Sequence, residues 1–119
     1  MNKQQIFDVV SAHLLKQGEC SIGAVESKHG DVCAYRGASG LRCAIGVLIP
    51  DDLYSPEFEG SQLMDLPWKI KRAVGFNTAA KRTLLCTLQK VHDNVPSYCW
   101  DDALQYVAED FGLKFTAPA

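Results

Sequence analysis

The chain has 119 residues, which is the size of one domain and enough to bury a hydrophobic core without disulfide or metal support. Apolar residues make up 47% and charged residues 22%, a balance that excludes a disordered or fibrous protein. The formal net charge of −2 excludes the strongly basic balance of proteins that bind nucleic acids or anionic membranes. We therefore expect a single domain over residues 1–119.

The N-terminal sequence and the cysteine count indicate the compartment. The first residues are polar and lack a signal-peptide core, and no stretch approaches the roughly 20 apolar residues of a membrane helix. The five cysteines are an odd number, which without a secretion signal favours free thiols in a reducing compartment. We expect a cytoplasmic protein that does not contact membranes and whose cysteines are mostly buried.

The first predicted element is a helix that begins after Asn2 and ends at Gly18. Asn2 can cap this helix, Gln5 is placed to complete a capping box, and glycine is a typical C-terminal stop. Side chains that recur at helical spacing define one buried face: Ile6, Val9, Val10, His13 and Leu14.

Two short β-capable runs follow, at residues 20–26 and 32–36, around a polar turn. They predict a β-hairpin, which must pack on the helices because an isolated hairpin is only marginally stable. Residues 40–49 fit either a strand or a short helix. We favour a helix that is capped by Ser39 and ended by Pro50, although Gly46 weakens it.

The second half of the chain predicts a structured loop and three helices. The loop, residues 51–65, has three anchoring side chains: Tyr54, Phe58 and Leu63. The helices have N-caps at Asp65, at Asn77 or Thr78, and at Ser97. The middle helix has this predicted buried face: Ala80, Leu84, Leu85, Leu88, Val91 and His92. The predicted fold is α+β and mainly α, with about five helices and a small β-hairpin packed on them.

The cysteine spacing gives little support to a metal site. A site at Cys33 and Cys43 would need His29 and the distant Cys20 as further ligands, and this spacing matches no common zinc motif. A Cys33–Cys43 disulfide is disfavoured by the reducing compartment. We expect neither a bound metal nor another cofactor.

A thiol enzyme is one hypothesis for Cys43. The N-terminus of the predicted short helix and the neighbouring Arg42 would lower the thiol pKa, and His92 and Asp93 could supply a base and its orienting carboxylate. The alternative is that Cys43 belongs to the core and that a His92 ring nitrogen hydrogen-bonds the backbone. Since nothing in the sequence brings these residues together, we expect no enzymatic activity.

The glycine-rich turn after Cys33 has the parts of an anion site. It offers flexible backbone N–H groups and two arginines, and its candidate ligand-binding residues are Arg36, Gly37, Ser39, Gly40 and Arg42. It is not a Walker loop, because no Gly-Lys-Ser/Thr follows. The turn predicts either a nucleotide or phosphate ligand, or a tight turn whose arginines pair with nearby carboxylates.

Charge is segregated along residues 50–82. The stretch 50–65 holds five acidic residues and no Lys or Arg, and the stretch 66–82 holds five basic residues and no acid. Such segments steer partners, unless the two meet and neutralise one another. Trp68 beside the basic residues is a candidate exposed anchor. The candidate partner-binding residues are Asp51, Asp52, Glu57, Glu59, Trp68, Lys69, Lys71, Arg72, Lys81 and Arg82.

Residues 33–60 carry a recognisable pattern. It reads Cys-x-Tyr-Arg, a glycine turn, Gly-Leu-basic-Cys-Ala, Leu-Ile-Pro-Asp and Tyr-x-Pro-x-x-Glu-Gly. The pattern resembles a group of small, uncharacterised proteins encoded by phages, prophages and their bacterial hosts. The resemblance extends from the predicted hairpin through the last helix.

No activity is known for this group, so the resemblance implies only that the protein is encoded by a phage, a prophage or a bacterial host. With that setting, the separated charged segments and Trp68 lead us to expect a small protein in the host cytoplasm that binds a host protein or defence complex and inhibits or modulates it, for example as an anti-CRISPR protein. Nucleotide binding at the Arg36–Arg42 turn is the alternative, and a thiol enzyme using Cys43 is the third hypothesis. The oligomeric state is not indicated by the sequence.

Overall fold

The computed structural model describes residues 1–21 and 34–116, which fold into four α-helices joined by irregular segments and short turns. The helices are α1 (Lys3–Gln17), α2 (Trp68–Ala73), α3 (Ala79–Asn94) and α4 (Trp100–Phe111). The 3-10 turns are Ala38–Gly40, Gly46–Leu48, Pro56–Phe58, Leu63–Asp65 and Ser97–Cys99. None of the helices in these two stretches is long and apolar enough to cross a membrane.

The predicted α+β class with a β-hairpin is wrong. The structure is mainly helical, and no β-strand occurs in either described stretch. Most of the predicted hairpin, residues 22–33, lies outside the described residues. At its base the Ala34 N–H donates to the Ser21 carbonyl at 2.9 Å, and an isolated antiparallel bridge pairs Arg36 with Arg42. These single pairings close turns and do not extend into a ladder within the described residues.

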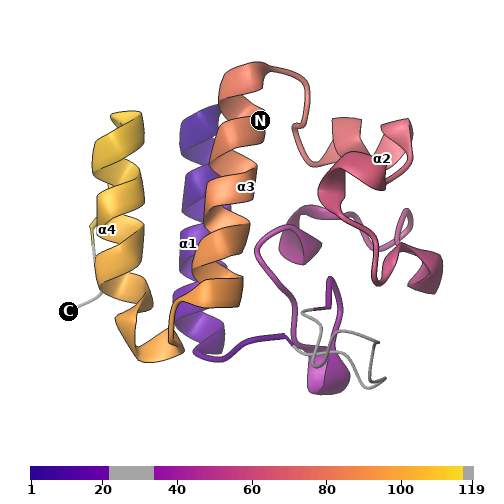
Figure 1. The fold of residues 1–119 in the computed structure, drawn as a ribbon, viewed down its shortest axis with the longest axis horizontal. Helices are drawn as coiled ribbons and strands as arrows, with labels where there is room; N and C mark the ends of the chain where they lie inside the picture. Colours follow the sequence, from indigo (N-terminus) through magenta and orange to yellow (C-terminus); the bar gives the residue numbers. More distant parts are fainter. Residues whose placement is uncertain (22–33, 117–119) are drawn as a thin grey trace.

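The three long helices form the body of the molecule. Figure 1 shows α1, α3 and α4 side by side, and each of them contacts the other two. The irregular segment 34–67 and α2 lie beside α3 on the side away from α4 (Figure 1). The core between these parts is one continuous apolar cluster that includes Ile6, Phe7, Leu14, Ile45, Leu84, Leu88, Trp100 and Leu104.

Helix α1 follows the sequence prediction closely. The Asn2 side chain accepts from the Gln5 N–H and the Gln5 side chain accepts from the Asn2 N–H, so the capping box is confirmed. The helix ends at Gly18, which adopts the left-handed conformation (φ 72°) that glycine tolerates. Ile6, Val10 and Leu14 are buried as predicted, but Val9 is 40% exposed and His13 is half-buried, and Phe7 is buried although it was not predicted.

The predicted helix over residues 40–49 is wrong, since that stretch holds no α-helix and only the end of one 3-10 turn and the turn Gly46–Leu48. Tertiary contacts take the backbone groups that a helix would need: the Arg42 N–H donates to the Gln17 side chain, and the Ile45 N–H donates to the Gln89 side chain. Gly46 also packs directly on the backbone of Tyr35, where an added Cβ would lie 1.9 Å from the carbonyl oxygen. Ser39 is therefore no helix cap and lies in a turn with φ 59°.

The three C-terminal helices are confirmed, and two of them begin later than predicted. Thr78 caps α3 as predicted, and the predicted α3 face is buried except for Ala80, which is exposed at the first turn. Asp65 lies in a 3-10 turn and does not cap α2, which begins at Trp68. The predicted cap Ser97 also lies in a 3-10 turn, and α4 begins at Trp100. The loop anchors are confirmed, as Leu63 is buried and Tyr54 and Phe58 pack against the core.

Candidate partner-binding surface

The two arginines of the glycine-rich turn form ion pairs with a carboxylate of the same chain. The Arg36 and Arg42 guanidinium groups both contact Asp51 Oδ1, at 2.7 and 3.2 Å. The Arg36 group also donates to the Ile49 carbonyl at 3.0 Å and lies 4.3 Å from the centre of the Tyr54 ring. The turn therefore pairs its arginines with a nearby carboxylate, and an external anion would have to compete with Asp51. The remaining candidates Gly37, Ser39 and Gly40 form the tight turn between the two arginines.

Glu59 ties the same region together. Its carboxylate accepts from the backbone N–H groups of Tyr35 and Arg36, at 2.8 and 3.1 Å, and from the Tyr54 hydroxyl. Burial, followed by the hydrogen bond to Glu59, raises the pKa of Tyr54 to about 12. We call Arg36, Arg42, Asp51, Tyr54 and Glu59 the Asp51 cluster. The ion pairs and hydrogen bonds of this cluster stabilise the fold of the segment between α1 and α2.

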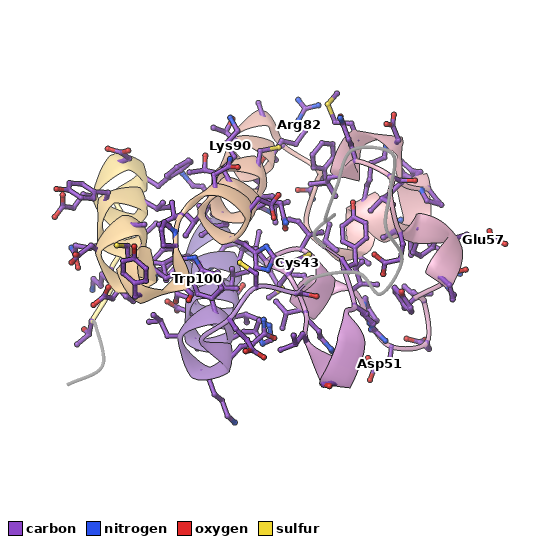
Figure 2. All side chains as sticks on the ribbon, turned by 60° about the horizontal axis from the view of Figure 1, so that its bottom comes forward. Cys43, Asp51, Glu57, Arg82, Lys90 and Trp100 are labelled. Carbon is purple, nitrogen blue, oxygen red and sulfur yellow. The ribbon has the colours of Figure 1, made fainter. Side chains whose placement is uncertain are left out.

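Only part of the acidic segment takes part in the Asp51 cluster. Asp51 and Glu59 serve the Asp51 cluster, whereas the side chains of Asp52 and Glu57 are exposed. Figure 2 shows Glu57 pointing outward at one edge of the molecule, and Arg82 at a different edge. In the described part of the chain no ion pair joins the acidic segment to the basic one. The two segments are not neutralised by direct pairing.

The basic segment builds a hollow between α2 and the start of α3. Trp68 and the basic residues come from α2 and α3, and the connection between these helices supplies Phe76 and Asn77. The hollow has a volume of about 370 Å³ and is lined by Trp68, Lys71, Arg72, Phe76, Asn77 and Arg82. We call these six residues, together with Met64, whose backbone carbonyl accepts a hydrogen bond from Lys71 Nζ, the Trp68 surface. Lys69 and Lys81 lie on the same helices and do not line the hollow.

The cations around the hollow are held by aromatic rings. The Arg72 guanidinium lies 5.3 Å from the centre of the Trp68 ring, and the Arg82 guanidinium lies 5.6 Å from that of Phe76. Lys71 Nζ lies 5.9 Å from the centre of the Phe76 ring and donates to the Met64 carbonyl at 3.2 Å. None of the three cations has a carboxylate partner among the described residues. The hollow is consequently electropositive.

The large apolar side chains at this surface are exposed to solvent. Trp68 is 69% exposed and Met64 is 67% exposed, so the predicted exposure of Trp68 is confirmed. Sequence reasoning missed Met64, Phe76 and Asn77. In the sequence Phe76 lies between the basic residues of two successive helices, but only the packing of these helices brings Lys71 and Arg82 to its ring.

The thiol and imidazole of the enzyme hypothesis are both in the interior. Cys43 is 1% exposed, lies at no α-helix N-terminus, and accepts a hydrogen bond from the Gly46 N–H. Figure 2 shows Cys43 inside the molecule, beside α3. Burial raises the pKa of its thiol to about 12, so the reactive thiolate is disfavoured at neutral pH.

His92 is fully buried and both of its ring nitrogens are engaged. Nε2 accepts from the Ser21 N–H at 2.9 Å, and Nδ1 lies 2.7 Å from Asp93 Oδ1. The ring also stacks on Trp100 at 5.7 Å. The prediction that His92 hydrogen-bonds the backbone is confirmed. With these contacts His92 positions the chain after α1 and is not placed as a base for Cys43.

The described residues contain no group of three or more His, Cys, Asp or Glu side chains that could hold a metal ion. Two of the residues considered for such a site, His29 and Cys33, lie outside the described residues. Comparison with known proteins finds no matching family model, no similar curated protein and no similar solved structure. The resemblance to the phage-encoded group therefore rests on the sequence pattern alone.

Proposed function

We propose that this protein is a non-enzymatic binding protein that attaches to a host protein or protein complex through the Trp68 surface and thereby inhibits or modulates it. The observation that supports the proposal is the hollow between α2 and α3, where two aromatic rings and three cations without carboxylate partners in the described structure lie together. Cations that are not used within the fold remain available for a partner of opposite charge.

The composition of the Trp68 surface supports a protein as the partner. Tryptophan and arginine are the residues most often found as interface hot spots, and methionine and phenylalanine are enriched at interfaces. All four residue types occur in the Trp68 surface, and Trp68 and Met64 are mostly exposed. An exposed tryptophan contributes little to the folded state, whereas burial of its ring against a partner would contribute strongly to binding.

The host setting of the proposal comes from the pattern at residues 33–60. Small phage proteins without catalytic motifs often act by binding host enzymes or defence complexes. The buried Cys43 and the engaged His92 support a binding role over thiol chemistry. We place the protein in the cytoplasm of the host on the same basis.

Two charge reversals of equal size test the proposal. Arg72→Glu with Arg82→Glu changes two residues that line the hollow, and Lys69→Glu with Lys81→Glu changes two residues of the same helices that do not line it. Both variants and the wild type are used for affinity capture from a lysate of the bacterial host, and mass spectrometry identifies the retained proteins. Circular dichroism and thermal unfolding verify that each variant is folded.

We expect a specific partner on the wild type and on the lysine variant, and its loss from the arginine variant. Affinity for the purified partner should fall at least about tenfold in the arginine variant, as is typical when interfacial charges are reversed. Equal retention of the partner by the folded arginine variant would contradict the proposal.

A further inference from the structure

We infer that the hollow of the Trp68 surface binds an acidic segment of the partner protein, with a carboxylate between Arg72 and Arg82 and a neighbouring apolar side chain on the exposed ring of Trp68. This inference rests on the proposed function and specifies the chemistry of its partner. It follows from the charge, the size and the surroundings of the hollow.

The positive charge of the hollow favours an anionic ligand. Lys71, Arg72 and Arg82 line it, and no carboxylate in the described stretches pairs with them. Arginine presents a planar set of N–H donors that matches a carboxylate, and such charge-assisted bonds are the stronger kind. The volume of about 370 Å³ is sufficient for side chains of a partner segment.

The cations are already arranged for binding. The rings of Trp68 and Phe76 lie against the two guanidinium groups, and the Met64 carbonyl accepts a hydrogen bond from Lys71 Nζ. Groups that are held in place before binding lose less conformational entropy when the ligand arrives. A carboxylate would therefore meet preorganised donors.

A protein carboxylate is favoured over a nucleic-acid strand for two reasons. First, the cations of the hollow are gathered at one point, whereas strand-binding surfaces extend along a positively charged groove with open aromatic faces for base stacking. Here cations lie over both rings. Second, domains that bind nucleic acids are usually strongly basic overall, whereas this chain has a formal net charge of −2.

Tryptophan fluorescence provides a direct test, because the two tryptophans have opposite environments. Trp68 is 69% exposed and Trp100 is fully buried, so a ligand at the hollow should alter the emission of Trp68. The probe is a short peptide of glutamates with one central phenylalanine. The comparison ligands are the same peptide with lysines in place of glutamates, and an oligothymidine strand.

We expect a saturable change in emission with the glutamate peptide and none with the lysine peptide. Affinity should fall at least about tenfold in the Arg72→Glu, Arg82→Glu variant, change only a few-fold in the Lys69→Glu, Lys81→Glu variant, and weaken as salt is added. An Arg72→Gln, Arg82→Gln variant, which removes charge without reversing it, should give a loss intermediate between wild type and reversal.

Three results would overturn the inference: no response to the glutamate peptide, an equal response to the lysine peptide, or a response to oligothymidine alone. These failures are distinct from failure of the proposed function. If the arginine variant still loses the host partner while the peptide gives no response, the proposed function stands and the acidic-segment inference falls. If the arginine variant retains the host partner, the proposed function itself falls.

Discussion

The Asp51 cluster and the Trp68 surface are both rich in cations, yet the two regions hold them in opposite ways. In the Asp51 cluster, Arg36 and Arg42 share one carboxylate, and Arg36 also reaches the Ile49 carbonyl. At the Trp68 surface, Arg72 and Arg82 lie only against aromatic rings among their described contacts. In the Asp51 cluster the charges are paired within the fold. At the Trp68 surface they remain available for a partner.

This difference shows that a sequence alone does not reveal which charged residues pair within the fold and which remain available for a partner. The acidic stretch and the basic stretch are equally strong as patterns, and each holds five like charges. Only the structure separates Asp51 and Glu59, which stabilise a turn, from the cations of the hollow, which have no carboxylate partner among the described residues. If the distinction is correct, substitutions in the Asp51 cluster should change stability, and substitutions at the Trp68 surface should change binding.

The largest effect on stability is expected from Glu59→Gln. The carboxylate accepts from two backbone N–H groups and one hydroxyl, and the amide that replaces it presents N–H donors toward some of these groups. We expect the free energy of unfolding to fall by about 2–3 kcal/mol, as is typical for partly buried donors that lose their acceptor. Denaturant unfolding measures the loss.

The matched control is Glu57→Gln, which alters an exposed carboxylate two residues away. Its effect should stay within about 0.5 kcal/mol, as for most surface substitutions. Equal effects at the two positions would remove the distinction between structural and exposed acids in this segment.

The second effect is a loss of stability in alkaline solution. Burial raises the pKa of the Cys43 thiol from 9.0 to about 12 and, together with Glu59, that of Tyr54 from 10.0 to about 12. Above these ordinary values the unfolded chain releases protons that the folded chain keeps, so deprotonation favours unfolding. The free energy of unfolding should fall as the pH rises from 9.0 toward about 12, and more steeply above 10.0, where Tyr54 contributes as well as Cys43. Burial also raises the pKa of Tyr35, which adds to the fall above pH 10.0.

Urea unfolding at a series of pH values measures this slope. Tyr54→Phe should flatten it, whereas Tyr98→Phe should leave it unchanged because Tyr98 is 84% exposed. A Tyr54→Phe variant with the wild-type slope would show that the Asp51 cluster does not hold the protonated Tyr54 hydroxyl.

The smallest expected changes in stability come from two single substitutions, one in the Asp51 cluster and one at the Trp68 surface. Asp51→Asn removes the shared partner of Arg36 and Arg42, but the Asp51 side chain is 76% exposed, so the loss should be about 0.5–1 kcal/mol. Arg72→Gln should change stability by less than about 0.5 kcal/mol, because it breaks no ion pair within the described residues. Thermal and denaturant unfolding of both variants give the comparison. A larger loss for Arg72→Gln than for Asp51→Asn would reverse the roles assigned to the two regions.

Much of the helical structure could be predicted because its signals are local. The capping box of Asn2 and Gln5, the cap Thr78 and the left-handed Gly18 act over a few residues, so the sequence alone indicates them. The α3 face from Leu84 to His92 was predicted correctly because a period of 3.6 residues brings these side chains to one side.

The segment between α1 and α2 could not be predicted in the same way. Residues 40–49 have enough apolar periodicity for a helix, but Gln17 and Gln89 bind the backbone groups of Arg42 and Ile45 from distant helices. Such bonds join residues that are far apart in sequence, so no local pattern encodes them. The candidate site shows the same limit, because the ring of Phe76 became relevant only when α2 and α3 were placed around it.

The sequence by itself indicated that the chain is mainly helical, where three of its helices lie, and that charge is divided into an acidic and a basic segment. These properties follow from composition, capping and periodicity, which are carried by neighbouring residues. Only the tertiary structure decided that Asp51 and Glu59 are used within the fold, that Cys43 is buried, and that Arg72 and Arg82 face one hollow. Whether a charge is satisfied depends on which groups folding brings near it, and that is a property of the packed chain.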